Sequence, residues 1–284
     1  MNLKKYFATI TLVNSFIIII SAMVIGQSRR GQITSQGQQN FQWPEGKRAA
    51  ISLSFDDGRP SQIDNGIPIF DRYNVKATFY VSPSGVEKRL DDWKKALANG
   101  HEIGNHTLSH PCTINYGSNS KNVLENYTLE MMEQEMDGAN VGIEKLLGVK
   151  PSTFAYPCGQ KYVGRGRNVK SYIPLVAERF IVGREWLSEN SNTPASCDLS
   201  HVMGMKIDGM TFEQVKELID QTVKNRKWLV LCGHNINPSG RGLTTFTSTL
   251  EELCKYAQDP ANGLWIDTVE NIGRYILEHR ANSE

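Results

Sequence analysis

Residues 51–58 read ISLSFDDG, a run of apolar and small residues that ends in two carboxylates and a glycine. Such a run predicts a strand that is buried in a sheet and ends at a turn. Along a regular strand, the side chains of Asp56 and Asp57 would point to opposite sides. A turn at Gly58 can instead bring both to one site, with one carboxylate as a metal ligand and the other as a base. The alternative, a solvent-exposed turn, is disfavoured by the buried strand that precedes it.

Strand-like and helix-like segments alternate on both sides of this run. The alternation predicts right-handed β-α-β units and a parallel sheet. About seven such units favour an α/β fold with a closed or nearly closed parallel barrel over an open doubly wound sheet. Strands are expected at residues 49–55, 76–81, 101–105, 153–156, 180–183, 201–207, 228–232 and 264–266, and helices at residues 61–73, 91–98, 123–147, 212–226, 246–257 and 268–279.

A second segment places His106 and His110 four residues apart. A helical turn would put both imidazoles on one face, where they could share a metal ion. An isolated pair would be more typical of capping or core histidines. Here His101, His106 and His110 are three of the six histidines in the chain and stand within ten residues. We therefore expect His106 and His110 to be metal ligands.

A third segment, residues 229–234, reads LVLCGH and predicts a strand that is buried on both faces and ends on His234. A histidine there can act as a general acid, because its unperturbed pKa is about 6.5. The alternative is a hydrogen-bonded core histidine. Asp56, Asp57 and His234 all follow strands at their carboxyl ends, where barrel enzymes place their sites. Adjacent aspartates argue against a glycosidase, whose two carboxyl groups lie about 5–9 Å apart across the sugar bond.

The first residues carry the features of an export segment. Lys4 and Lys5 precede an apolar stretch at residues 6–25. This pattern predicts a signal peptide or a retained membrane anchor at residues 1–26, because about 20 apolar residues span a bilayer. In both cases the rest of the chain is exported, and is periplasmic, secreted or anchored with the catalytic domain outside the cytoplasm. We expect a polar linker at residues 27–46 and one catalytic domain at residues 47–284.

The net charge and the cysteine content of the chain limit the kinds of partner and of metal site that we expect. The 284 residues carry a formal net charge of +1, which gives no reason to expect nucleic-acid binding, and no protein partner is indicated. The five cysteines match no zinc-ribbon or CxxC spacing, and their odd number leaves at least one thiol unpaired within the chain. We expect most of them to be free, with Cys232 buried in a strand and Cys254 on a helix face.

Four segments resemble, in order, the motifs of the polysaccharide deacetylase family, the NodB-homology domain of carbohydrate esterase family 4. They read SFDDG at residues 54–58, GHEIGNHTLSH at 100–110, FAYPCG at 154–159 and LCGH at 231–234. The resemblance covers about residues 47–280, and its second segment is highly specific. The fold that the resemblance implies is a distorted parallel (β/α) barrel, in agreement with the alternation of segments.

The resemblance also implies a role for each matched residue. Asp56 would be the catalytic base, His234 the general acid, and Asp57, His106 and His110 the ligands of one divalent metal ion, most often Zn²⁺. The third motif would contact substrate and stabilise the oxyanion through a backbone N–H. That motif comprises Tyr156, Pro157, Cys158 and Gly159.

Two departures from the family pattern suggest a subgroup. Ala155 stands where the family commonly has an arginine that holds the base, and Arg184 is the candidate replacement. Cys158 stands where a tyrosine or tryptophan is common. The aspartate of the fourth motif, which orients the catalytic histidine, is not recognisable, and Glu185 and Asp198 are the candidates.

The sequence thus predicts an exported, metal-dependent hydrolase that removes N-acetyl groups from a glycan containing N-acetylglucosamine. One alternative is an O-acetyl esterase that acts on an acetylated xylan-like polymer. Another is a catalytically degenerate barrel that only binds carbohydrate. A carbohydrate is the partner in every case, with membrane attachment through residues 1–26 if that segment is retained.

Overall fold

The computed structural model of the chain describes residues 41–116 and 122–280. The export segment predicted at residues 1–26 lies outside these residues. Within the two described ranges, no helix combines the length and the apolar character needed to cross a membrane.

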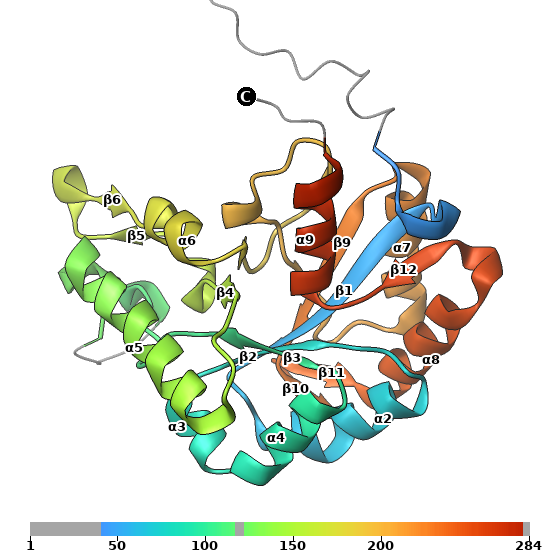
Figure 1. Cartoon of the computed structure of the whole chain (residues 1–284), viewed down its shortest axis with the longest axis horizontal. Coiled ribbons are helices and arrows are strands. Elements are labelled where there is room, and N and C mark those ends of the chain that lie inside the picture. Colours follow the sequence, from blue (N-terminus) through green and yellow to red (C-terminus); the bar gives the residue numbers. More distant parts are fainter. Residues whose placement is uncertain (1–40, 117–121, 281–284) are drawn as a thin grey trace, which may run out of the picture. The chain divides into compact units, whose positions relative to one another are not determined.

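The described part is built on one curled parallel sheet (Figure 1). Among the described residues, seven strands follow one another in the order β7-β4-β3-β2-β1-β9-β8, and β12 pairs with β1 at the side. Two small two-stranded sheets, β5 with β6 and β10 with β11, lie apart from it. The strands are β1 (Ala49–Asp56), β2 (Thr78–Val81), β3 (Glu102–Asn105), β4 (Thr153–Ala155), β5 (Tyr162–Val163), β6 (Lys170–Ser171), β7 (Val182–Arg184), β8 (Met205–Lys206), β9 (Trp228–Gly233), β10 (Asn235–Asn237), β11 (Thr244–Phe246) and β12 (Leu264–Ile266).

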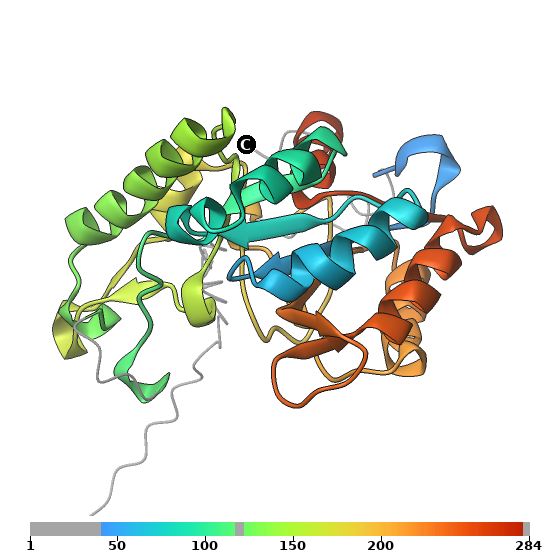
Figure 2. The same cartoon turned by 90° about the horizontal axis from the view of Figure 1, so that it is seen from below.

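Helices line the outside of the sheet, with α4 beside α5 and α7 beside α8 (Figures 1 and 2). The α-helices are α2 (Ile67–Arg72), α3 (Pro83–Glu87), α4 (Leu90–Ala98), α5 (Leu129–Leu147), α6 (Ile173–Arg179), α7 (Phe212–Lys224), α8 (Thr247–Gln258) and α9 (Val269–His279). A π-helical turn, η2 (Gln62–Gly66), leads into α2. Short 3₁₀ turns are η1 (Pro44–Gly46), η3 (Ile114–Tyr116), η4 (Leu124–Asn126), η5 (Pro157–Gly159), η6 (Gly166–Asn168), η7 (Leu199–His201) and η8 (Pro260–Asn262).

One short segment joins the two ends of the sheet. Val202 forms a parallel bridge with Arg184 of β7, and its N–H donates to the carbonyl of Gly183 at 2.7 Å. The same segment then becomes β8, in which Met205 pairs with Leu231 of β9. The sheet is therefore a distorted, nearly closed barrel, and the predicted parallel α/β barrel of about seven strands is confirmed.

Most predicted elements are present, and those that differ have local causes. The helix expected from residue 123 begins at Leu129, because the hydroxyl of Thr128 accepts from the N–H of Met131 at 3.3 Å and caps it. The strand expected at residues 201–207 is reduced to Met205–Lys206, because η7 ends at His201 and Val202 bridges to Arg184 of β7 before the chain reaches β9. Helix α6 lies where the sequence pattern indicates no regular element.

The packed domain begins before residue 47. Phe41 and Trp43, which belong to the predicted linker, are 5% and 3% exposed. The indole N–H of Trp43 donates to the carbonyl of Arg226 at 3.1 Å, and its ring stacks on Tyr275 of α9. Apolar burial in the packed domain therefore extends at least to Phe41, which precedes the boundary predicted at residue 47.

Strand β1 lies inside the sheet, paired with β2, β9 and β12. All eight of its residues are buried, as expected of a parallel strand covered on both faces. Phe55 packs against Phe70 and Phe79 with ring centroids 5.6 and 5.9 Å apart. This packing holds the carboxyl end of β1, where Asp56 lies, in a fixed position.

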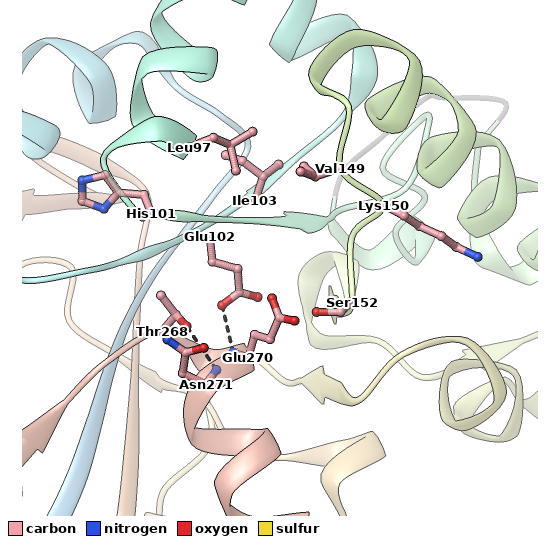
Figure 3. Close-up of a pocket in the computed structure, with 11 residues that line it drawn as sticks. Leu97, His101, Glu102, Ile103, Val149, Lys150, Ser152, Thr268, Glu270 and Asn271 are labelled. Carbon is pink, nitrogen blue, oxygen red and sulfur yellow. Dashed lines mark hydrogen bonds between the residues drawn. The ribbon is translucent and has the colours of Figure 1, made fainter.

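A buried carboxyl group lies at the amino end of β3, beside a pocket of about 190 Å³ (Figure 3). Glu102 is 7% exposed and accepts from the hydroxyls of Thr78, at 2.7 Å, and Thr153. It also accepts from the N–H of Glu270, at the start of α9, at 2.9 Å. Burial outweighs these donors and raises the pKa of Glu102 to about 7.

We expect Glu102 to make the stability of the protein pH-dependent. Its folded-state pKa of about 7 lies above the ordinary value of 4.5, so its contribution is fully present below pH 4.5 and lost as the pH rises through 7. The loss is about 3 kcal/mol. Glu102→Gln removes the titration with little change of shape. Chemical unfolding at about pH 5 and about pH 9 should show this loss in the wild type relative to the variant. Parallel pH profiles of the two proteins would contradict the assignment.

Candidate active site

The motif residues meet at the carboxyl ends of the central strands. Asp56 ends β1, His106 follows β3 and His234 follows β9. In the order β3-β2-β1-β9, β1 is the neighbour of β9 and is separated from β3 by β2 alone. Parallel strands present their carboxyl ends at the same edge, so residues far apart in the chain are brought together there.

Asp57, His106 and His110 form a cluster whose ligand atoms lie within 4.8 Å of one another. The Nε2 atoms of His106 and His110 each lie 3.6 Å from Oδ1 of Asp57. The two imidazole centroids are 4.7 Å apart. The three side chains therefore direct one oxygen and two nitrogens toward a common point.

The two histidines come together without the helical turn that their spacing allows. Residues 106–110 form a loop in which Thr107 and His110 have φ values of 64° and 54°. Asn105 organises it, because its Oδ1 accepts from the N–H of Thr107 at 2.8 Å while its Nδ2 donates to Asn140 of α5 at 2.7 Å. The Thr107 hydroxyl in turn accepts from the N–H of His110 at 3.0 Å. Side-chain bonds therefore bring the imidazoles together without a helix.

Contacts behind the cluster orient its members. Nδ1 of His106 lies 3.0 Å from the carbonyl oxygen of Ala155. A carbonyl only accepts, so in the neutral ring this nitrogen carries the proton and leaves the Nε2 lone pair facing Asp57. Oδ2 of Asp57 accepts from Nε and Nη2 of Arg59 at 3.0 and 2.8 Å. Nδ1 of His110 lies 3.6 Å from Sγ of Cys112.

The electrostatics of the cluster suit a divalent ion. Burial and the charge of His106 lower the pKa of His110 to about 4, which favours its neutral form. Burial opposes ionisation of Asp57, but hydrogen bonds and charge from His106, with Arg59, outweigh it and hold that pKa below its usual value. Burial opposes protonation of His106, but the carboxylates of Asp56 and Asp57 outweigh it and raise the pKa of His106, so the cluster attracts positive charge. With both imidazoles in the neutral form that a metal ion requires, the three side chains would match the donor set of catalytic metal sites that keep positions open for water and substrate.

Asp56 lies next to this cluster and pairs with Arg184. Nη2 of Arg184 donates to Oδ1 of Asp56, and both side chains are buried. Burial opposes ionisation of Asp56, but the charge of Arg184, helped by His106 and His234, holds its pKa below the usual value. Arg184 is itself held by the carbonyl of Glu185 at 3.0 Å and lies over the ring of Tyr80. The structure thus gives Asp56 a guanidinium partner from β7 rather than from position 155.

His234 is held by a residue that the sequence analysis missed. Its Nδ1 lies 2.7 Å from Oδ2 of Asp208, and its N–H donates to Oδ1 of the same carboxylate at 3.1 Å. Asp208 is 1% exposed and also accepts from the hydroxyl of Thr245 at 2.7 Å. The ring of Trp186 meets the His234 imidazole edge-on at 4.7 Å. A signal was available, because Asp208 directly follows a predicted strand, as Asp56 does.

The two residues proposed from sequence to hold His234 lie elsewhere. The carboxylate of Glu185 contacts Lys161, His201 and Ser188. Asp198 caps η7 by accepting from the N–H of Ser200 at 2.9 Å. Neither is a partner of His234, and that prediction is wrong.

The third motif forms a tight turn beside the cluster. Cys158 has a φ of 53°, and Gly159 has a φ of 66° with its α-carbon so close to Trp186 that an added Cβ would lie 2.9 Å from the Trp186 carbonyl. Pro157 is buried, and so is Tyr156, whose hydroxyl donates to the carbonyl of Ser200 at 2.6 Å. The Tyr156 side chain therefore packs inside the domain, where it supports the turn, and does not line an exposed surface.

Cys158 and Cys112 form a disulfide, which cysteine spacing did not predict. The other three cysteines are free: Cys232 and Cys254 are buried, as expected, and Cys197 is half-buried. Three of the five cysteines are therefore free, as expected, and the disulfide beside the candidate site was not predicted.

Comparison with known proteins agrees with this geometry. The sequence model described as Polysaccharide deacetylase matches residues 44–172. The peptidoglycan-N-acetylglucosamine deacetylase PgdA of Listeria monocytogenes is 42% identical over 62 residues, which make up 22% of this chain and 13% of that protein. The chain spans between 10% and 27% of the length of the first curated relatives that it matches.

Solved structures share the fold. A probable polysaccharide deacetylase from Pseudomonas aeruginosa PAO1 aligns with a TM-score of 0.61 and 16% identity, over 84% of this chain and 95% of that one. A family 4 acetyl xylan esterase from Clostridium thermocellum, in complex with a cobalt ion, aligns with a TM-score of 0.53 and 20% identity, over 82% of this chain and 93% of that one.

The fold and the cluster define a parallel-barrel protein with a candidate metal site at the carboxyl ends of its strands. The match to the family model over residues 44–172 and the order of the motifs then show which group the chain is similar to: over that range it resembles the polysaccharide deacetylase family.

Proposed function

We propose that the protein is a metal-dependent deacetylase that hydrolyses N-acetyl groups of a glycan containing N-acetylglucosamine. One observation carries the proposal: two groups able to move protons, Asp56 with Arg184 and His234 with Asp208, lie beside the Asp57–His106–His110 cluster. Hydrolysis of an amide needs both, because water must lose a proton and the leaving amine must gain one. The naming of PgdA as a peptidoglycan-N-acetylglucosamine deacetylase supports this substrate class.

In this proposal Asp57, His106 and His110 hold one divalent ion, with Zn²⁺ as the first candidate. A bound ion supplies Lewis acidity toward the acyl carbonyl and toward water. Asp57 is kept ionised by Arg59, and His106 is kept in its ligating tautomer by the Ala155 carbonyl. The donor set, and not the identity of the metal, follows from these contacts.

The remaining residues carry the proton transfers. Asp56, kept ionised by Arg184, accepts the proton of the attacking water. The N–H of Cys158 donates to the oxygen that becomes negative as the carbonyl carbon turns tetrahedral. His234, oriented by Asp208, gives a proton to the sugar nitrogen as the carbon–nitrogen bond breaks. Acetate and a free amine are the products.

We expect Asp208→Asn to lower acetate release by about 10²-fold, the lower end of what a positioned acid contributes. The amide keeps the size of the carboxylate, but its nitrogen only donates, so when it faces Nδ1 of His234 it cannot accept from the doubly protonated ring that gives up a proton. The metal content should not change, because Asp208 does not contact the cluster. Wild-type turnover in the variant would contradict the assignment of Asp208.

An O-acetyl esterase is the alternative, since the acetyl xylan esterase of C. thermocellum has the same fold. The test is acetate release from N-acetylglucosamine oligomers and from acetylated xylan by the full-length chain. The proposal expects release from the oligomers. Release from the xylan alone would favour the esterase, and release from neither would favour a barrel that only binds carbohydrate.

His234→Ala separates amide from ester chemistry. We expect about 10²–10⁴-fold loss on an N-acetyl substrate, because an amine must be protonated to leave. A nitrophenyl acetate ester, whose phenolate leaves without protonation, should retain most of its rate. Equal losses on both substrates would contradict a general-acid role for His234.

We also propose that the domain works outside the cytoplasm. Lys4, Lys5 and the apolar stretch that follows them indicate export. The Cys112–Cys158 disulfide supports this, because disulfides persist in oxidising compartments and are rare in reducing ones. Cell fractionation with an antibody to the domain tests the location.

A further inference from the structure

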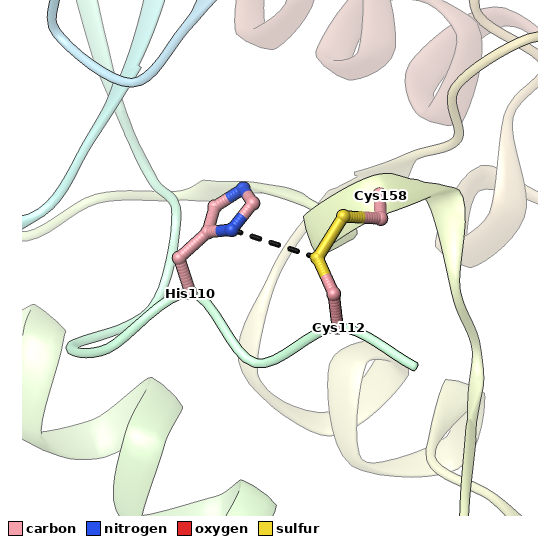
Figure 4. Close-up of side chains that lie close together, drawn as sticks. All are labelled: His110, Cys112 and Cys158. Carbon is pink, nitrogen blue, oxygen red and sulfur yellow. Dashed lines mark hydrogen bonds between the residues drawn. A yellow bond between two sulfur atoms is a disulfide. The ribbon is translucent and has the colours of Figure 1, made fainter. Parts of the chain in front are cut away.

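The two loops that bracket the candidate site are covalently joined (Figure 4). Cys112 follows His110 by two residues, and Cys158 is the turn residue of the third motif. Their disulfide links positions 46 residues apart in the chain. It therefore ties the loop that carries one proposed metal ligand to the loop that carries the proposed oxyanion donor.

The disulfide also contacts His110 directly. Figure 4 shows the contact of Cys112 Sγ with Nδ1 of His110, at 3.6 Å. This nitrogen is not the one that faces Asp57, because Nε2 of His110 does so. The corresponding nitrogen of His106 contacts a backbone carbonyl at 3.0 Å. In metal sites this outer nitrogen is usually held by a carboxylate, a carbonyl or water, and the contact sets the ring orientation. For His110 a disulfide sulfur stands in that place.

His110 needs such support more than His106 does. The His110 side chain is 40% exposed, whereas that of His106 is 3% exposed and enclosed by its neighbours. His110 and Cys158 both have positive φ values, 54° and 53°. A non-glycine residue is disfavoured in this region and persists only where its surroundings impose it. The disulfide joins the segments that carry these two strained residues.

We propose that the Cys112–Cys158 disulfide is a positioning element of the metal site. It holds the His110 imidazole in the orientation that directs Nε2 toward Asp57 and His106, and it fixes the third-motif turn relative to that imidazole. This inference rests on the proposed function, in which Asp57, His106 and His110 hold a metal ion. Its consequence is that the affinity for metal depends on the disulfide, although neither sulfur is a ligand.

The test is the Zn²⁺ affinity of the oxidised full-length chain and of its Cys112→Ala/Cys158→Ala variant, measured by competition with a chromophoric chelator. Alanine is used because free thiols or hydroxyls so close to His110 could themselves bind the ion. We expect the variant to bind Zn²⁺ about 10–100-fold more weakly, as is typical when an outer contact of a ligand is lost. The absorption spectrum with Co²⁺ should also change, because the geometry around the ion is less constrained.

Cys254→Ser is the matched control. It places a hydroxyl in the apolar core on α8, so it should lower the melting temperature without touching either loop. The control should bind Zn²⁺ as the wild type does. A double variant that melts earlier but keeps wild-type Zn²⁺ affinity and an unchanged Co²⁺ spectrum would show that the disulfide is only structural. A wild-type chain that binds no Zn²⁺ would overturn the proposed function together with this inference.

Discussion

Asp57→Asn should remove both metal binding and acetate release. Oδ1 of Asp57 is the one carboxylate oxygen in the ligand cluster, 3.6 Å from each imidazole Nε2. An asparagine at this position brings no negative charge to a divalent ion and also loses the ion pair with Arg59. The Lewis acidity of a metal contributes several kcal/mol to such a reaction, so we expect acetate release to fall at least about 10³-fold. Equilibrium dialysis with Zn²⁺ and an acetate assay measure the two effects.

Asp56→Asn is the matched control for Asp57→Asn. The two aspartates are adjacent, and each substitution removes one charge from the end of the same strand. Asp56 pairs with Arg184 and lies outside the cluster of ligand atoms. We therefore expect Asp56→Asn to bind Zn²⁺ normally and to lose about 10²–10⁴-fold in rate, the contribution of a general base. Loss of metal in both variants, or in neither, would contradict the division of roles.

Arg184→Met should be among the most damaging substitutions for both stability and rate. The Arg184 side chain is fully buried, and its removal leaves the carboxylate of Asp56 buried without its main partner. Breaking a buried ion pair from one side costs about 3–5 kcal/mol of unfolding free energy. The rate should fall as well, because Asp56 is then less ionised and less well oriented. Urea unfolding and the acetate assay measure the two losses.

The double variant Asp56→Asn/Arg184→Met tests whether this stability loss comes from the unpaired charge. Removing both partners leaves no buried charge, so the double variant should be more stable than Arg184→Met. Its rate should stay as low as that of Asp56→Asn alone. Additive losses of stability would mean that the two side chains act independently and that the ion pair is not the main interaction of Arg184.

The parts of the site that follow strands could be predicted from the sequence. Asp56, Asp57 and His234 come directly after runs such as ISLSF and LVLCG, which read as buried strands. In a parallel sheet the carboxyl ends of such strands share one edge, so the residues that follow them meet. The same rule applies to Asp208, which directly follows the strand predicted at residues 201–207.

The parts that depend on loops could not be predicted. The approach of His106 to His110 depends on Asn105 and Thr107 side chains that bond to the loop backbone, and a spacing of four residues is equally compatible with a helix. The disulfide joins two loops whose proximity exists only in the folded barrel, so the spacing of Cys112 and Cys158 carries no signal. Arg184 is the candidate partner of Asp56, and the structure pairs the two, but only the family resemblance indicates that a guanidinium is needed, since Arg184 ends a three-residue strand 128 positions from Asp56.

The central claim is that this chain hydrolyses an N-acetyl bond with a metal held by Asp57, His106 and His110. Its most direct test is acetate release from an N-acetylglucosamine oligomer by the full-length protein, assayed as purified, after removal of metal with a chelator, and after addition of Zn²⁺. We expect release that is lost on chelation and restored by about one equivalent of Zn²⁺ per chain. Acetate release that is unchanged after complete removal of metal would contradict the account.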